Sequence, residues 1–245
     1  MQNQYDPRTT QDGFNPAASV GVPRAARDAG LRSYMLSVYN YMASGVLLTG
    51  IVAMTLAMTG VAEAIFSGGI LKWVVIFAPL IMIMIMGARM QRMSTAAMQG
   101  FFWAFAAVMG LSMSIIPLIY DGSSIATTFF ATSAAFLSLS LYGYTTKKDL
   151  SGLGTFLIMG VVGLLVVMIA NMFIRSTGLS LAISAIGVLL FAGLTVYDTQ
   201  KIKSMYAHVA GTDMLGKTVI MGALTLYLDF INMFQFLLAF MGNRE

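Results

Sequence analysis

Seven apolar segments, each about 20 residues long or longer, constrain this chain more than any other feature of its sequence. A helix of that length crosses the ~30 Å hydrocarbon core of a bilayer. Only 10% of the residues are charged and 58% are hydrophobic, a surface too apolar for a water-soluble protein. The sequence therefore predicts an all-α membrane protein with seven transmembrane helices. The segments cover roughly residues 34–58, 70–88, 100–120, 125–144, 153–174, 179–199 and 218–241.

The chain divides into two parts by composition. Residues 1–32 are polar and hold no apolar run, which predicts a disordered cytoplasmic tail without a signal peptide. Residues 33–245 form the seven-helix transmembrane domain, and its connections are short and rich in turn residues. Helices that follow one another in sequence should therefore be antiparallel neighbours.

The distribution of positive charge predicts the orientation. Eleven of the 14 lysines and arginines fall in the tail and in the second, fourth and sixth connections. By the positive-inside rule this side is cytoplasmic, so the N-terminus lies inside and the C-terminus outside. The same charges explain the basic composition, and no nucleic-acid partner is expected. The chain has no cysteine, which excludes disulfides, thiolate metal sites and thiol catalysis.

Two aspartates lie where the hydropathy predicts lipid. Asp198 is near the inner end of the sixth segment, and Asp229 is near the middle of the seventh. A charged group inside a membrane is costly and marks a functional site by default. If the two carboxyls meet, they should share a proton and lie within hydrogen-bond distance of each other. The alternative is that each aspartate is only a hydrogen-bonding anchor between helices.

Further polar residues accompany this pair. Asn232 and Gln235 follow Asp229 at steps of three residues, so one polar stripe runs along the last helix and should face protein or water. Arg89 and Arg92 share a helical face at the inner end of the second segment, on the same side as Asp198. Either arginine could bind the carboxylate, or both could simply contact lipid headgroups.

Three motifs resemble one family. The segments Leu141–Ser151, Val196–Ile202 and Leu224–Asn232, in this order, are similar to those of the Bax inhibitor-1 (transmembrane Bax inhibitor motif) family in its bacterial branch. The resemblance covers residues 33–241.

The resemblance implies a fold in which the other six helices enclose the last one. It also implies a pH-sensitive calcium leak through the bacterial inner membrane, gated by an aspartate pair that matches Asp198 and Asp229. The family's arginine latch matches Arg92 without a gap, or Arg89 with a small one. Calcium is then the transported ion, in transient contact with the two aspartates, and no cofactor is expected.

Two other classes of protein compete with this interpretation. An intramembrane aspartyl protease also carries two aspartates on consecutive helices, but Leu226-Tyr227-Leu228-Asp229 lacks the Gly-x-Gly-Asp pattern, so an enzyme is not expected. A non-conducting scaffold or a modulator of membrane proteases would use the same fold with the aspartates as structural anchors. The sequence leaves that alternative open, and it predicts no particular protein partner.

Overall fold

The computed structural model describes residues 24–89 and 92–243, which are helical and contain no strand. Seven of the helices are long and apolar enough to cross a membrane, which confirms the predicted fold class. A short helix, α2, lies in the first connection, and a 3-10 turn, η2, follows α4. The elements are α1 (Arg24–Met58), α2 (Val61–Phe66), α3 (Leu71–Arg89), α4 (Thr95–Met113), η2 (Ile116–Leu118), α5 (Gly122–Thr145), α6 (Ser151–Ile174), α7 (Thr177–Val209) and α8 (Met214–Met241).

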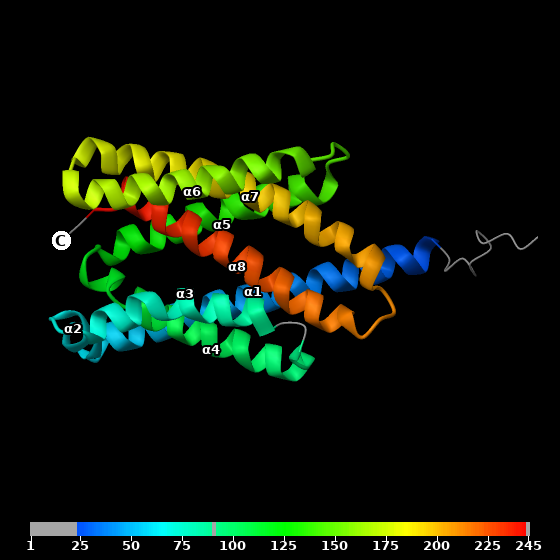
Figure 1. Cartoon of the computed structure of the whole chain (residues 1–245), viewed down its shortest axis with the longest axis horizontal. Helices are drawn as coiled ribbons and strands as arrows, with labels where there is room; N and C mark the ends of the chain where they lie inside the picture. Colours follow the sequence, from blue (N-terminus) through cyan, green and yellow to red (C-terminus); the bar gives the residue numbers. More distant parts are fainter. Residues whose placement is uncertain (1–23, 90–91, 244–245) are drawn as a thin grey trace, which may run out of the picture.

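The last helix occupies the centre of the bundle. Figure 1 shows α8 running obliquely between a layer that contains α6 and α7 and a layer that contains α3 and α4. Of the seven spans, α8 is the most buried. It packs directly on α7, α1, α5 and α4, whereas α3 packs mainly on α4 and α6 on α7. Four of the six other spans therefore form the main enclosure of α8, with α3 and α6 outside it.

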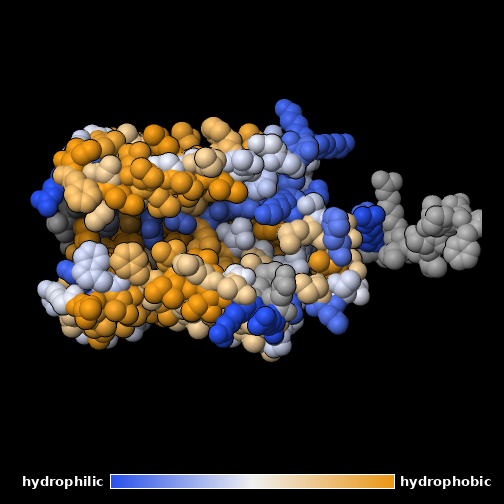
Figure 2. All heavy atoms as spheres, viewed as in Figure 1, coloured by the Kyte–Doolittle hydropathy of each residue, from blue (hydrophilic) through white to orange (hydrophobic). Residues whose placement is uncertain are grey.

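The surface is that of a protein embedded in lipid. Figure 2 shows hydrophobic side chains over most of this face and hydrophilic ones gathered at the end where α1 begins. Large apolar side chains such as Phe173 (82% exposed) and Leu189 (72% exposed) point outward. Hydrophilic side chains also show in the hollow between the two apolar layers, so the bundle has a polar interior as well as a polar end.

A hydrogen-bonded tyrosine joins three helices at the core. The Thr49 hydroxyl of α1 donates to the carbonyl of Ala106 in α4 at 2.8 Å. It therefore accepts from the Tyr227 hydroxyl of α8, 2.6 Å away. Phe102 and Phe105 pack edge-on against the Tyr227 ring. A fully buried hydroxyl is thus satisfied without water, and α8 is fixed to α1 and α4.

Two of the predicted spans have long polar extensions. The first begins at Arg24, so residues 24–32 are helical and the predicted tail is too long at this end; the rest of it lies outside the described residues. The sixth span continues to Val209, so His208 lies in the last turn of a helix and not in a loop. Hydropathy misses both extensions because they consist of polar residues beyond the hydrocarbon, where a helix needs no apolar surface.

Candidate functional site

The hairpin of α7 and α8 brings the two aspartates to similar depths. Asp198 lies about 16 Å along α7 from the connection between the helices, and Asp229 about 22 Å along α8. Ile202 packs against Gly222, which fixes the antiparallel alignment. Because α7 continues to Val209, past the predicted end of its span at residue 199, Asp198 lies well inside the helix, and the two depths differ by only about 6 Å.

Both carboxyls are buried and act on each other electrostatically. Asp198 is 9% exposed and Asp229 is 4% exposed, and the charge of Asp198 acts on the Asp229 carboxyl. One oxygen of Asp229, Oδ2, is buried without a hydrogen-bond partner among the described residues. Buried polar atoms are rarely left unpaired, so this oxygen is available to a proton or a passing cation. A hydrogen bond between the two carboxyls stays a prediction.

A large vestibule approaches the pair from the opposite end of the bundle, with several polar side chains in a mainly apolar lining. It has a volume of about 890 Å³ and lies between α6, α7 and α8. The predicted stripe, Asn232 and Gln235, lines it, as do Asn171 and Ser180, which hydrogen-bond to each other at 2.7 Å. Gln235 is exposed within a membrane span, which is expected only for a side chain that faces water. Arg175, at the turn from α6 to α7, is the charged residue of the lining.

The vestibule ends just short of the aspartates. Its deepest lining residue on α8 is Asn232, one turn from Asp229, and on α7 it is Phe191, two turns from Asp198. The Asn232 side-chain amide donates to the backbone carbonyl of Leu228. A closed segment of one to two helical turns therefore separates the vestibule from the carboxyls.

The family assignment follows from the comparison with known proteins. The family profile described as inhibitor of apoptosis-promoting Bax1 matches residues 31–245. The chain belongs to the Bax inhibitor-1 family. It is 47% identical to an uncharacterized protein of Rickettsia prowazekii, over 89% of this chain and 92% of the relative. It is 42% identical to the inner membrane protein YbhL of Escherichia coli, over 96% of this chain and all of the relative.

These names are consistent with the seven spans. A relative in Streptococcus pyogenes, 32% identical over 89% of this chain and 96% of that protein, carries the name uncharacterized membrane protein. The present Bax inhibitor-1 protein is therefore a multi-pass membrane protein, as its spans indicate.

The two arginines predicted as a latch lie at the exposed connection between α3 and α4. Arg89 ends α3 and Arg92 follows it, and both side chains are exposed. The positive charge that acts on Asp198 belongs instead to Lys201, three residues later on α7. The structure thus brings Asp198 and Asp229 together but pairs neither arginine with them, and the latch of this Bax inhibitor-1 protein stays a prediction.

Sequence reasoning missed two parts of the site. One is Lys201, which follows Asp198 by three residues. This spacing places the two side chains on one helical face and could have indicated their interaction. The other is a hydroxyl cluster beside Asp198, in which Tyr39 of α1 hydrogen-bonds to Ser140 of α5 and Thr199 of α7. The cluster joins three helices that are distant in sequence, so no local pattern predicts it.

The acidic side chains of the site are few. Among the described residues, no group of three or more His, Cys, Asp or Glu side chains could hold one. Calcium takes six to eight oxygen ligands, roughly, in a stable protein site.

Proposed function

We propose that this Bax inhibitor-1 protein is a pH-sensitive calcium leak channel of the bacterial inner membrane, with Asp198 and Asp229 as its gate and pH sensor. The observation that supports it best is the vestibule with its polar stripe, which ends one helical turn from a buried carboxyl with an oxygen unpaired among the described residues. Intramembrane carboxyls that adjoin a water-accessible cavity are typical of ion pathways.

The route begins among amide and hydroxyl groups, with one positive charge, that of Arg175, in the same lining. Asn171, Ser180, Asn232 and Gln235 supply amide and hydroxyl dipoles to the vestibule, and such groups can replace part of an ion's hydration shell. The aspartates then supply the negative charge that favours a cation over an anion. Weak binding suits conduction, because an ion that is held firmly does not leave.

The gate in this proposal works through shared protonation. Two carboxyls in a low dielectric cannot both ionise cheaply, so at neutral pH the pair keeps one proton and one negative charge. That charge attracts a cationic side chain at the inner end and holds the helix ends together. Full protonation in acid removes the charge, and the inner ends of α3, α7 and α8 separate.

Several charged or titratable groups lie on the elements that pack around the pair. Lys201 acts on Asp198 in the closed arrangement. Arg92 or Arg89 reaches the pair only if the connection between α3 and α4 moves inward, and in this proposal that movement forms the latch. The groups on the elements packed around the pair are Arg32 and Tyr39 on α1, Tyr144 on α5, Lys201 and Lys203 on α7, and Lys217 on α8.

Calcium flux from loaded vesicles tests this function. The purified full-length chain should release calcium at a rate well above that of protein-free vesicles, and Asp229→Asn should change the rate and its pH dependence. Phe173→Ala, at a lipid-facing position, is the control and should conduct as the wild type does. If the wild type and Asp229→Asn both fail to conduct although folded, the chain is a scaffold with structural aspartates and the proposal is wrong.

A further inference from the structure

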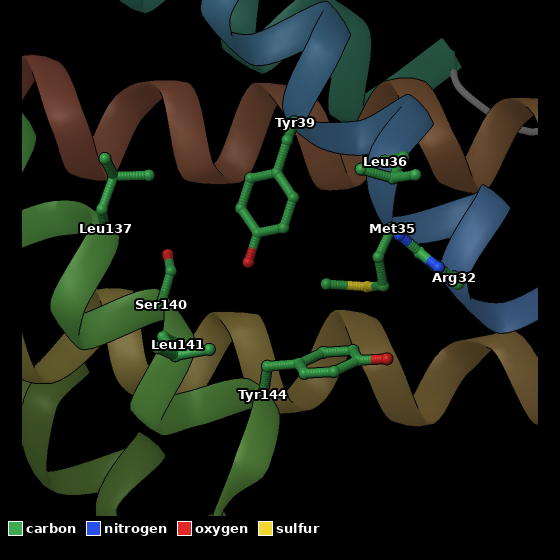
Figure 3. A pocket seen from close by; sticks show the side chains of 8 residues that line it. All are labelled: Arg32, Met35, Leu36, Tyr39, Leu137, Ser140, Leu141 and Tyr144. Atoms are coloured by element: carbon green, nitrogen blue, oxygen red, sulfur yellow. The ribbon is translucent and has the colours of Figure 1, made fainter. Parts of the chain in front are cut away.

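A slot opens between α1 and α5 at the basic end of the bundle. α5 packs on α7 and α8, and α1 packs on α4 and α8, but α1 and α5 make little contact with each other. The slot has a volume of about 390 Å³ and is lined by four residues of α1, from Arg32 to Tyr39, and four of α5, from Leu137 to Tyr144. Figure 3 shows the two sets facing each other across it, with the Met35 thioether reaching into the space.

The slot is apolar along its length and cationic at one end. Leu36, Leu137 and Leu141 form its walls and are more than half exposed. Arg32 lies at the end nearer the start of α1, and the Tyr39 hydroxyl points toward Ser140 farther in (Figure 3). From Arg32 to Tyr39 is about 10 Å along the helix. This depth reaches from the headgroup region of a membrane into the hydrocarbon.

A polar pocket adjoins the cationic end. It has a volume of about 330 Å³ and lies between the start of α1, the end of α5 and the inner part of α7. Arg27 and Lys203 are in its lining, together with Asp28. Lys203 donates to the backbone carbonyl of Tyr144 and lies 4.8 Å from the centre of that ring. Together with Arg32, the cationic end of the slot therefore has three positive side chains and one negative side chain. None of these four side chains forms an ion pair with a described residue.

We propose that the slot and the pocket together bind one anionic phospholipid from the leaflet at the basic end. The phosphate lies among Arg27, Arg32 and Lys203, where positive charge and tyrosine rings suit the membrane interface. One acyl chain enters the slot and ends near Tyr39. A soluble phosphate compound would leave the apolar slot empty, so the amphipathic shape favours a lipid.

The bound chain touches a cluster that adjoins the candidate gate. The Tyr39 hydroxyl hydrogen-bonds to Ser140 and Thr199, and Thr199 follows Asp198 directly. An acyl chain in the slot holds α1 and α5 at their present separation around this cluster. The lipid site does not depend on ion conduction, because a scaffold with the same fold would contain it too.

Native mass spectrometry of the purified full-length chain tests whether the site prefers an anionic headgroup. With equal amounts of phosphatidylglycerol and phosphatidylcholine of the same chain length, the wild type should retain the anionic lipid about fivefold better. Arg32→Gln should reduce this preference toward parity. Arg175→Gln removes an arginine at the opposite end of the bundle and should retain it. Equal retention of both lipids by the wild type, or equal losses in the two variants, would overturn the proposal.

A second variant tests the slot. Leu137→Trp fills it and should lower retention of both lipids without changing the preference between them. Leu189→Trp places the same ring on an exposed position of α7 and should have no effect. Competition by glycerol phosphate at the concentration that phosphatidylglycerol requires would show that the pocket binds a soluble anion, and would contradict a role for the slot.

Discussion

Phe191 of α7 stacks on Phe236 of α8, with ring centroids 5.8 Å apart and planes inclined by 24°. Phe191 precedes Asp198 by seven residues, and Phe236 follows Asp229 by seven residues. The same antiparallel pairing of α7 and α8 therefore places the two rings side by side and the two aspartates at similar depths. Gly187 makes the stack possible, because a Cβ at that position would overlap the Phe236 ring. Both rings line the vestibule, and Phe191 is its deepest lining residue on α7.

We expect the stacked rings of Phe191 and Phe236 to be a barrier to the passage of calcium. Phe191→Ala should extend the vestibule toward Asp198 and raise the calcium leak about tenfold, which corresponds to lowering a barrier by ~1.4 kcal/mol. The truncation also destabilises the fold, by about 3 kcal/mol, so flux is measured at a temperature where the variant remains folded. Phe173→Ala, which faces lipid, should leave the leak unchanged. An unaltered leak in Phe191→Ala would mean that the ring does not block the route.

Gly143 in α5 is a position where a larger side chain should destabilise the fold. A Cβ on Gly143 would overlap the backbone carbonyl of Val196 in α7. Gly143→Ala should therefore push α5 away from α7 and lower the free energy of unfolding by about 1 to 3 kcal/mol. Gly163→Ala on α6 meets no atom within 4 Å and should be neutral or slightly stabilising, since alanine favours a helix. Thermal melting in detergent checks both variants, and equal melting temperatures would contradict the close contact.

Removal of the buried hydroxyl of Tyr227 should cause a modest loss of stability. Tyr227→Phe removes the donor to Thr49 while the ring and its packing remain, so the free energy of unfolding should fall by about 1 kcal/mol. Tyr142→Phe removes a hydroxyl from an exposed tyrosine and should change little. Denaturation of the two variants in the same detergent distinguishes them. A larger loss for Tyr142→Phe would show that the buried hydrogen bond has been misassigned.

The seven crossings predict on which side of the membrane the two ends of the last helix lie. Figure 1 shows that α8 ends on the side of the bundle opposite its connection to α7, and the positive-inside rule puts that connection in the cytoplasm. A topology reporter fused after Glu245 should therefore report the external side, and one inserted next to His208 the cytoplasm. Two reporters on the same side would contradict seven complete crossings.

The sequence alone was sufficient for the spans, and it singled out the two aspartates as candidates. Continuous hydropathy over a bilayer's thickness predicts a helix whatever its neighbours are, and Asp229 stands out because almost nothing else in the last span is charged. The polar stripe of Asn232 and Gln235 followed from helical spacing and does line the vestibule. These features depend on local pattern only.

Features that depend on how helices meet could not be predicted. Hydropathy cannot detect the polar extension of α7 that aligns Asp198 with Asp229. The vestibule needs residues of α6 such as Asn171, which the sequence shows only as an isolated amide. Pro117 ends α4 early because proline lacks the donor that continues a helix, and a 3-10 turn replaces the predicted end of that span.

The central claim is that protonation of the pair formed by Asp198 and Asp229 opens a cation route. Calcium flux into vesicles between about pH 5 and pH 8 tests it most directly, because the half-protonated pair should lose its negative charge within that range. Asp149 gives a matched control, because hydrogen bonds from Ser151 hold the pKa of that exposed carboxyl below its ordinary value. It therefore stays ionised throughout the range.

The account predicts that flux through the wild type rises as the pH falls. Asp198→Asn should flatten the profile, and Asp229→Asn should move the midpoint toward the free-aspartate value of about 3.9. Asp149→Asn should reproduce the wild-type curve. Identical pH profiles for the wild type, Asp198→Asn and Asp229→Asn would contradict the mechanism.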